Sequence, residues 1–362
     1  MGCKFRILNF VFELFCISKQ LMVFYLFYSY FIDNLMYKSR KPFNTFYLDV
    51  GGDTSIFVKE YGNPKGVPII VSHGGPGGAY TSDGITKRFY LKKTHLITYD
   101  QRGCGKSKPL LSVKGNTTNA MIEDIRKIKA HFNFDKFIIA GGSWGAMLSI
   151  MYTAKYPEDI LCYIACSGCY FFDNTVWPRE MFKLHYDKWE KFCKLIGVPQ
   201  KDIEDRNISF SKQRKICKKY FEKIKASAGT AKRPNKYALQ WYYFEDDVLY
   251  TCKKEKDAAQ KDESKDKYKK KYEIAFYESL YYWKNFFTTG KKLKESLKKM
   301  KHVPGYIIHG RMDVICDVNE SIQLHKLLPK SKLHLVNGEG HSGKEQHLVY
   351  KDIVTKLAKT NF

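Results

Sequence analysis

The segment Gly141-Gly142-Ser143-Trp144-Gly145 follows the pattern G-x-S-x-G and separates two stretches of different character. The apolar, β-favouring stretch 136–140 before it predicts a buried parallel strand. The stretch 146–154 after it predicts a helix. A strand, a tight turn and a helix in this order would hold the Ser143 hydroxyl above the sheet, with the positive end of the helix beneath it. We therefore interpret Ser143 as a nucleophile; the alternative is a Gly-Ser turn with a structural role.

The same alternation of strands and helices continues through most of the chain from residue 41 onward. A hairpin is expected first, with strands at 46–50 and 55–60 joined by a Gly-Gly-Asp turn. Further strands are expected at 67–72, 94–100, 160–166, 303–309 and 332–336, and further helices at 117–131 and 344–358. Strands that alternate with helices indicate a doubly wound, mostly parallel α/β sheet.

This alternation stops between about 173 and 289, where lysine and aromatic residues are frequent. Helical patterns occur there near 179–196, 211–227, 236–250 and 268–287. We interpret 173–289 as a helical cap that is inserted into a core formed by 41–172 and 290–362.

Residues 1–38 are expected to lie outside this fold. Two apolar runs, 5–16 and 21–32, are each shorter than the roughly twenty residues that a membrane-spanning helix needs. Together they indicate a signal, an anchor or an interfacial helix, and thus a targeting role or membrane association through 1–38. The alternative is an ordinary helix packed on the core.

The chain is strongly basic, with 62 Lys and Arg against 37 Asp and Glu and a formal net charge of +25. The excess is scattered and accompanies no helix-turn-helix, RNA-recognition motif or zinc-finger spacing, so nucleic acid is not an expected partner. The ten cysteines lack the spacing of a small disulfide-rich domain. The C-x-x-C at 166–169 has no second pair to support zinc, and we interpret it as buried thiols at a strand end.

A serine hydroxyl is a poor nucleophile near neutral pH, so Ser143 requires a base, and the base requires a carboxylate that orients it. Asp313 comes directly after one expected strand and suits the role of the acid. His341 comes after the next strand, on a glycine-flanked loop that can reach back across the sheet to Ser143. The competing candidates are Asp317 for the acid and His347 for the base.

The tetrahedral intermediate of such chemistry carries a negative oxygen that needs hydrogen-bond donors. One expected donor is the backbone N–H of Trp144, directly after the nucleophile. The second is expected from the glycine-rich loop 73–78, where we assign Gly75, with Gly74 as the alternative, because Pro76 has no N–H. The pattern G-x-x-x-x-G-K-[ST] of a phosphate-binding loop is absent from this segment.

Five short motifs together make the sequence similar to one known family. They are H-G-G-P-G-G at 73–78, D-Q-R-G-C-G-K-S at 100–107, G-G-S-W-G at 141–145, G-R-M-D at 310–313 and G-H-S at 340–342. With them the sequence resembles the proline iminopeptidases, or prolyl aminopeptidases, which are serine peptidases of the α/β-hydrolase fold. The resemblance covers 41–362. We interpret Asp100 and Arg102, within the second motif, as structural and as a partly buried ion pair.

The resemblance implies a serine aminopeptidase that releases an N-terminal residue, preferably proline, from peptides with a free N-terminus. An acyl-enzyme on Ser143 would be formed and hydrolysed with the help of His341 and Asp313. No metal and no organic cofactor is implied, and the family resemblance places the core in the cytoplasm. The alternatives are an esterase or lipase-like hydrolase with the same triad that acts near a membrane, and a catalytically silent binding protein on the same scaffold.

The resemblance also implies two glutamates in the cap that bind the free amine of the substrate. Glu245 ends the segment A-L-Q-W-Y-Y-F-E at 238–245, and Glu278 lies within A-F-Y-E-S-L-Y-Y at 275–282; both segments are similar to cap motifs of the family. Two carboxylates suit this ligand because a prolyl ammonium has two N–H donors and one positive charge. Nearby aromatic residues would form an apolar slot for the proline ring.

Overall fold

The computed structural model describes residues 40–80, 82–170, 172, 185–205, 207–226, 235–249 and 265–360, without the side chains of 246–249 and 265–267. The predicted extension 1–38 and the segments 173–184 and 250–264 of the predicted cap lie outside the described residues. No helix within the described ranges is both long enough and apolar enough to cross a membrane.

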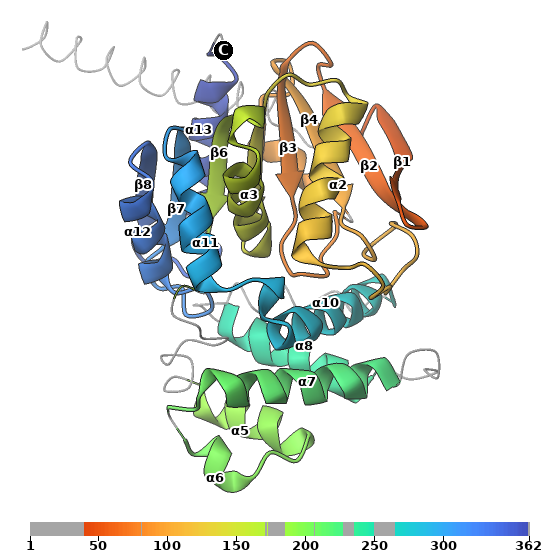
Figure 1. The fold of residues 1–362 in the computed structure, drawn as a ribbon, viewed down its shortest axis with the longest axis vertical. Coiled ribbons are helices and arrows are strands. Elements are labelled where there is room, and N and C mark those ends of the chain that lie inside the picture. The colour runs from red at the N-terminus through yellow and green to blue at the C-terminus, as the bar shows by residue number, and fades with distance from the viewer. Residues whose placement is uncertain are drawn as a thin grey trace, which may run out of the picture.

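Eight strands form one sheet in the order β1-β2-β4-β3-β5-β6-β7-β8 (Figure 1). Their bounds are β1 Asn44–Gly51, β2 Thr54–Gly62, β3 Val67–Ser72, β4 Thr94–Asp100, β5 Phe137–Gly142, β6 Ile160–Cys166, β7 Gly305–Gly310 and β8 Ser331–Val336. The pairs β1–β2 and β2–β4 are antiparallel, whereas all pairs from β4 to β8 are parallel. The predicted mostly parallel α/β-hydrolase sheet is therefore confirmed.

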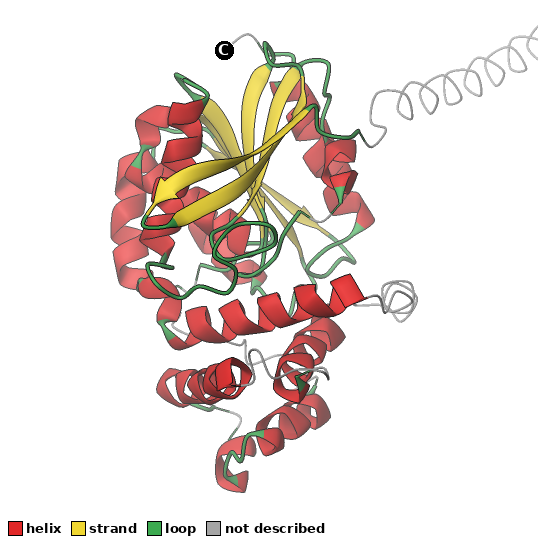
Figure 2. Ribbon diagram, turned by 90° about the vertical axis from the view of Figure 1, so that its right-hand side faces the viewer, coloured by secondary structure: helices red, strands yellow, loops and turns green. Residues whose placement is uncertain are grey.

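Both faces of the sheet are covered by helices, which explains why its central strands are rich in apolar residues. Every residue of β4 is buried. On one face the core contains residues of α2 (Thr118–His131), α3 (Trp144–Lys155) and α12 (Val318–Leu327), and on the other it contains residues of α13 (Lys344–Leu357). Figure 2 shows these helical layers on either side of the twisted sheet. The sequence pattern did not indicate α12, which follows the loop that carries Asp313.

A group of helices lies beyond the carboxyl ends of the parallel strands (Figures 1 and 2). It contains α5 Tyr186–Leu195, α6 Gln200–Ile203, α7 Phe210–Ala226, α8 Lys236–Leu249 and α10 Lys265–Trp283. Aromatic rings join these helices: Phe192 stacks on Tyr220 and on Phe244, with ring centroids 4.1 Å and 4.3 Å apart. Helices α5, α7, α8 and α10 match the four helical patterns expected from the sequence, whereas α6 was not expected. The cap boundaries at 173 and 289 stay a prediction.

Arg102 forms a buried ion pair, but its partner is not Asp100. The guanidinium donates from Nε to Oδ2 of Asp124 at 2.8 Å and from Nη2 to Oδ1 at 2.5 Å. Asp100 instead accepts hydrogen bonds from the backbone N–H groups of Tyr80 and Lys106, at 3.0 Å and 2.9 Å. The predicted pair of Asp100 and Arg102 is therefore wrong, because the true partner lies on α2 and the local motif does not encode the position of that helix.

The buried pair predicts that Asp124→Ala lowers the free energy of unfolding by about 3–5 kcal/mol, because the Arg102 guanidinium is left buried without a carboxylate. The neighbouring Glu123 offers a matched control. It pairs with Lys155 at the surface, where both side chains are more than a third exposed, so Glu123→Ala should cost less than about 1 kcal/mol. Urea unfolding followed by circular dichroism measures both variants, and equal losses would contradict the role of the buried pair.

Candidate active site

Ser143 lies on the turn between β5 and α3 in a backbone conformation that side chains rarely adopt, with φ +56° and ψ −127°. The glycines of the motif are required by backbone contacts. A Cβ on Gly141 would lie 2.2 Å from the carbonyl oxygen of Gly145, and a Cβ on Gly145 would lie 2.3 Å from that of Ser72. A Cβ on Gly142 would meet nothing closer than 3.8 Å. Close packing of β3, β5 and α3 therefore explains which positions of the motif must be glycine.

His341 and Asp313 form a hydrogen-bonded pair, as the sequence order predicted. Nδ1 of His341 lies 2.8 Å from Oδ2 of Asp313, whose carboxylate is fully buried, whereas the imidazole is 11% exposed. A carboxylate only accepts hydrogen bonds, so Nδ1 carries the hydrogen and Nε2 is the basic nitrogen.

Further donors hold the carboxylate of Asp313. The N–H groups of Ile315 and Cys316 donate to Oδ1 at 3.0 Å and 2.9 Å, and Nε2 of His309 lies 3.0 Å from Oδ2. Burial alone would raise the pKa of Asp313, but the charge of His341 and the hydrogen bonds from His309 and His341 hold it far below its ordinary value. His309 was not predicted from the sequence, although it lies near the end of β7, four residues before the acid.

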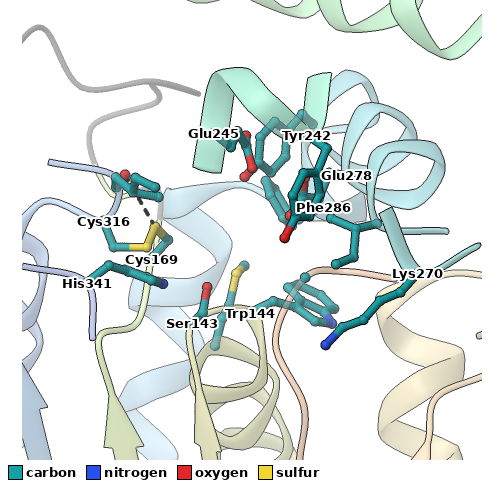
Figure 3. Close-up of a pocket in the computed structure, with 15 residues that line it drawn as sticks. Ser143, Trp144, Cys169, Tyr242, Glu245, Lys270, Glu278, Phe286, Cys316 and His341 are labelled. Carbon is teal, nitrogen blue, oxygen red and sulfur yellow. Dashed lines mark hydrogen bonds between the residues drawn. A yellow bond between two sulfur atoms is a disulfide. The ribbon is translucent and has the colours of Figure 1, made fainter. Parts of the chain in front are cut away.

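Ser143 and His341 line one cavity of about 250 Å³, together with residues of α8 and α10. Figure 3 shows a ring nitrogen of His341 directed toward the Ser143 hydroxyl. In the described part of the chain His341 donates to Asp313 and makes no hydrogen bond with Ser143. Catalytic hydrogen bonds are often long before a substrate is bound and shorten in its complex.

The two predicted oxyanion donors, Gly75 and Trp144, line this same cavity. Trp144 is the first residue of α3, so its backbone N–H has no acceptor within the helix. Gly75 has φ +113°, and a Cβ on it would lie 2.7 Å from the nitrogen of Gly77, so glycine is required at this position. Gly74, the alternative donor, lines a neighbouring cavity instead.

Gln101 connects the glycine-rich loop to the turn of the nucleophile. Its side chain accepts from Nε1 of Trp144 and donates to the carbonyl of His73, both at 2.9 Å. Its backbone N–H donates to Nε2 of His73 at 3.0 Å, so Nδ1 carries the hydrogen and donates to the carbonyl of Gly74 at 2.8 Å. Burial lowers the pKa of His73, which favours the neutral ring that this network needs. The sequence motif contained Gln101, but its connecting role was not predicted.

Glu245 on α8 and Glu278 on α10 lie across the cavity from Ser143 (Figure 3). Nε1 of Trp241 donates to Oε2 of Glu278 at 2.8 Å. Burial, the charge of Glu245 and a hydrogen bond to Glu245 raise the pKa of Glu278 well above its ordinary value. Two carboxyl groups buried next to each other disfavour each other's negative charge. The structure thus directs both acids into the cavity and not toward bulk solvent.

Apolar side chains cover the wall between these acids and the nucleophile. The indole of Trp144 packs against Phe286, with ring centroids 5.5 Å apart. Other apolar side chains in the lining come from Met147, Ile274 and Tyr282. The helix predicted over 268–287 ends at Trp283, because Asn285, Phe286 and Phe287 all have positive φ. This irregular turn places Phe286 at the cavity, a position that the helical pattern of the sequence did not reveal.

The competing acid and base have other partners. Asp317 caps α12 by accepting the N–H of Asn319 at 2.8 Å. His347, on α13, accepts a hydrogen bond from Nη2 of Arg88 at 2.8 Å. Neither of them takes part in the hydrogen-bonded pair beside Ser143.

A disulfide joins Cys169 to Cys316 in the wall of the same cavity. The prediction of buried thiols at 166–169 is therefore wrong for Cys169, whereas the first cysteine of that motif remains a half-buried thiol. The partner lies 147 residues away, so the motif spacing gave no signal. Asp313, Cys316 and His341 are close enough together to bind a metal. However, the sulfur of Cys316 is in the disulfide and Nδ1 of His341 donates to Asp313, so the trio offers no complete set of ligands.

Comparison with known proteins agrees with this geometry. A family model described as the alpha/beta hydrolase fold matches residues 67–348. Among solved structures, MGS-M2, an alpha/beta hydrolase enzyme from a Medee basin deep-sea metagenome library, has a similar fold with a TM-score of 0.60 and 16% identity. That match covers 88% of this chain and 98% of the other. Fold and site together define a protein of the α/β-hydrolase class.

Among known sequences, the probable proline iminopeptidase of Leptolyngbya boryana is 30% identical over 319 residues, which cover 85% of this chain and 91% of that protein. The proline iminopeptidase of Neisseria meningitidis serogroup B is 28% identical over 323 residues, which cover 87% and 95% of the two chains. The chain therefore belongs to the proline iminopeptidase family of α/β hydrolases.

The surroundings of His341 predict a pH dependence. Burial would lower its pKa, but the charge and hydrogen bond of Asp313 and the charge of Glu245 raise it above 6.5. Only the neutral imidazole can accept the proton of Ser143, so kcat/KM should fall as the pH drops through this raised pKa. Asp313→Asn removes the charge, which should move the acid limb to lower pH and reduce kcat by about 10⁴-fold.

The pH profile of hydrolysis of a chromogenic proline amide measures both effects. Asp317→Asn, which changes a carboxylate of the same loop region without touching His341, should leave the acid limb in place. An acid limb that does not move in Asp313→Asn would contradict the assignment of this residue.

Proposed function

We propose that the protein is a serine aminopeptidase that releases an N-terminal residue, preferably proline, from peptides through Ser143, His341 and Asp313. The observation that carries this proposal is the buried pair of Asp313 and His341 at a cavity that Ser143 shares with two acidic side chains. The names of the related proline iminopeptidases support the choice of substrate.

In the proposed reaction, Nε2 of His341 accepts the proton of Ser143 while Oγ attacks the carbonyl carbon of the N-terminal residue. Asp313 stabilises the imidazolium, and the N–H groups of Gly75 and Trp144 bind the negative oxygen. The imidazolium then gives its proton to the leaving amine, and an acyl-enzyme remains on Oγ. A water molecule, deprotonated by the same imidazole, attacks the acyl carbon and releases the free amino acid.

Glu245 and Glu278 bind the ammonium group of the substrate in this proposal. Each N–H of a prolyl ammonium donates to one carboxylate in a charge-assisted hydrogen bond. Burial and the charge of Glu245 raise the pKa of Glu278, and the positive charge of a bound ammonium offsets the repulsion between the two carboxylates. The apolar wall of Trp144 and Phe286 provides a surface for the pyrrolidine ring.

This role predicts that Glu245→Gln and Glu278→Gln each lower kcat/KM for a proline-linked fluorogenic amide by about 10-fold to 100-fold, which is the range for a hydrogen bond to a charged group. Hydrolysis of a short-chain ester without an amine should change much less. Glu222→Gln is a control on the cap surface, where Glu222 pairs with Lys218, and it should behave as wild type. Equal losses of amide and ester turnover would contradict the amine-binding role.

The same comparison separates the alternative functions. Wild type that hydrolyses the ester but not the proline amide would indicate an esterase or lipase-like enzyme. A catalytically silent binding protein would leave Ser143 unlabelled by a fluorophosphonate, whereas an active nucleophile is labelled in wild type and not in Ser143→Ala.

We further propose that the core works in the cytoplasm, as the family resemblance implies, and that residues 1–38 serve in targeting or membrane association. The two apolar runs of that segment support this role. The full-length chain should then sediment with membranes, whereas a chain that begins at Lys41 should stay in the supernatant. Recovery of both chains in the supernatant would exclude an anchoring role for 1–38.

A further inference from the structure

A second cavity, of about 400 Å³, adjoins the first at the nucleophile. The two cavities share the lining residues Ser143, Lys270 and His341. The second is otherwise lined by core elements: the glycine-rich loop, the short helix η1 (Asp83–Arg88) and the first turns of α13. The second cavity therefore lies beside the nucleophile, next to the cavity that holds the two acids.

The second cavity differs from the first in the sign of its charged side chains. Arg88 lines it and donates to His347 at 2.8 Å, while its guanidinium lies over the ring of Tyr350, 5.7 Å from the centroid. Burial and the charge of Arg88 lower the pKa of His347 to about 4, so the ring is neutral at neutral pH and adds no charge. Within the ranges that the structure describes, no carboxylate forms an ion pair with Arg88.

Lys270 brings a second positive charge to the boundary between the cavities. Figure 3 shows its side chain reaching from α10 toward the core. His73 lies in the wall of the second cavity. Burial is the main reason why the pKa of His73 is lowered, and the charge of Lys270 lowers it further. The carboxylate of Glu339 also influences the pKa of His347, and it accepts the N–H groups of Glu345 and Gln346. Glu339 does not line the second cavity, and the lysine and arginine side chains in that lining are Lys270 and Arg88.

A short peptide with free ends matches this arrangement, because its two ends carry opposite charges. One residue spans at most about 3.3–3.6 Å, so the carboxylate of a dipeptide lies within one residue of the scissile bond and that of a tripeptide within two. A longer or amidated peptide places neutral amides in the same space. An amide carbonyl can accept a hydrogen bond from a guanidinium or ammonium group, but it brings no negative charge, so the pair is weaker than one with a carboxylate.

We propose that the second cavity binds the leaving group and that Arg88 and Lys270 select leaving groups with a carboxylate one or two residues from the scissile bond. Dipeptides and tripeptides with a free C-terminus are then better substrates than amidated or longer peptides. This inference rests on the proposed aminopeptidase function. An acidic side chain next to the scissile bond offers the same chemistry, and the experiment distinguishes it from the terminal carboxylate.

The test compares kcat/KM of the full-length protein for Pro-Ala, for Pro-Ala amide and for Pro-Glu amide, measured as released proline. Pro-Ala should be preferred over its amide at least tenfold. Turnover of Pro-Glu amide at the level of Pro-Ala would show that a side-chain carboxylate is accepted as well, whereas turnover at the level of Pro-Ala amide would assign the selection to the terminal carboxylate. Equal values for all three peptides would overturn the proposal.

Variants assign the selectivity to the two cations. Arg88→Met and Lys270→Met should each reduce the ratio of Pro-Ala to Pro-Ala amide at least threefold. Lys87→Met and Lys269→Met remove exposed neighbouring charges that do not line the cavity, and they should keep the wild-type ratio. A wild-type ratio in the double variant of Arg88 and Lys270 would overturn the proposal. Failure of the aminopeptidase function gives a different result, because wild type would then release proline from none of the three peptides.

Discussion

The candidate site depends on one buried hydrogen bond, between Asp313 and His341. A fully buried carboxylate is costly unless its oxygens are paired, and here His341, His309 and the backbone N–H groups of Ile315 and Cys316 satisfy both oxygens. The bond fixes which imidazole nitrogen is basic. Ser143, Asp313 and His341 lie on the three loops that follow β5, β7 and β8. These loops lie at the same edge of the sheet because the strands are parallel.

The charges around this bond are linked to one another. Glu245 contributes to the raised pKa of His341, so its charge stabilises the protonated imidazole from across the cavity. In the proposed function, an ammonium bound between the acids offsets their charge and favours the neutral imidazole that the first step needs. Recognition of the amine and activation of the base would then be parts of one electrostatic arrangement.

The sequence alone predicted the sheet, the turn at Ser143 and the pair of Asp313 and His341, because each follows from a local pattern and from the fixed order of parallel strands. It did not predict contacts between distant segments, such as the pairing of Arg102 with a residue of α2 or the connection made by Gln101. Helix α12 was missed as well, because no element was assigned between the strands expected at 303–309 and 332–336. Helix α10 ends earlier than expected because Asn285, Phe286 and Phe287 have positive φ, which the sequence pattern did not predict.

The disulfide joins Cys169 to Cys316, which are 147 positions apart, and the covalent ring that it closes contains α5, α6, α7, α8 and α10. Asp313 lies inside the ring, whereas Ser143 and His341 lie on the two chain segments that leave it. A protease that cuts the cap once would therefore produce two fragments that remain attached through the sulfurs. The nucleophile and the base would stay in one molecule on a non-reducing gel and separate only after reduction.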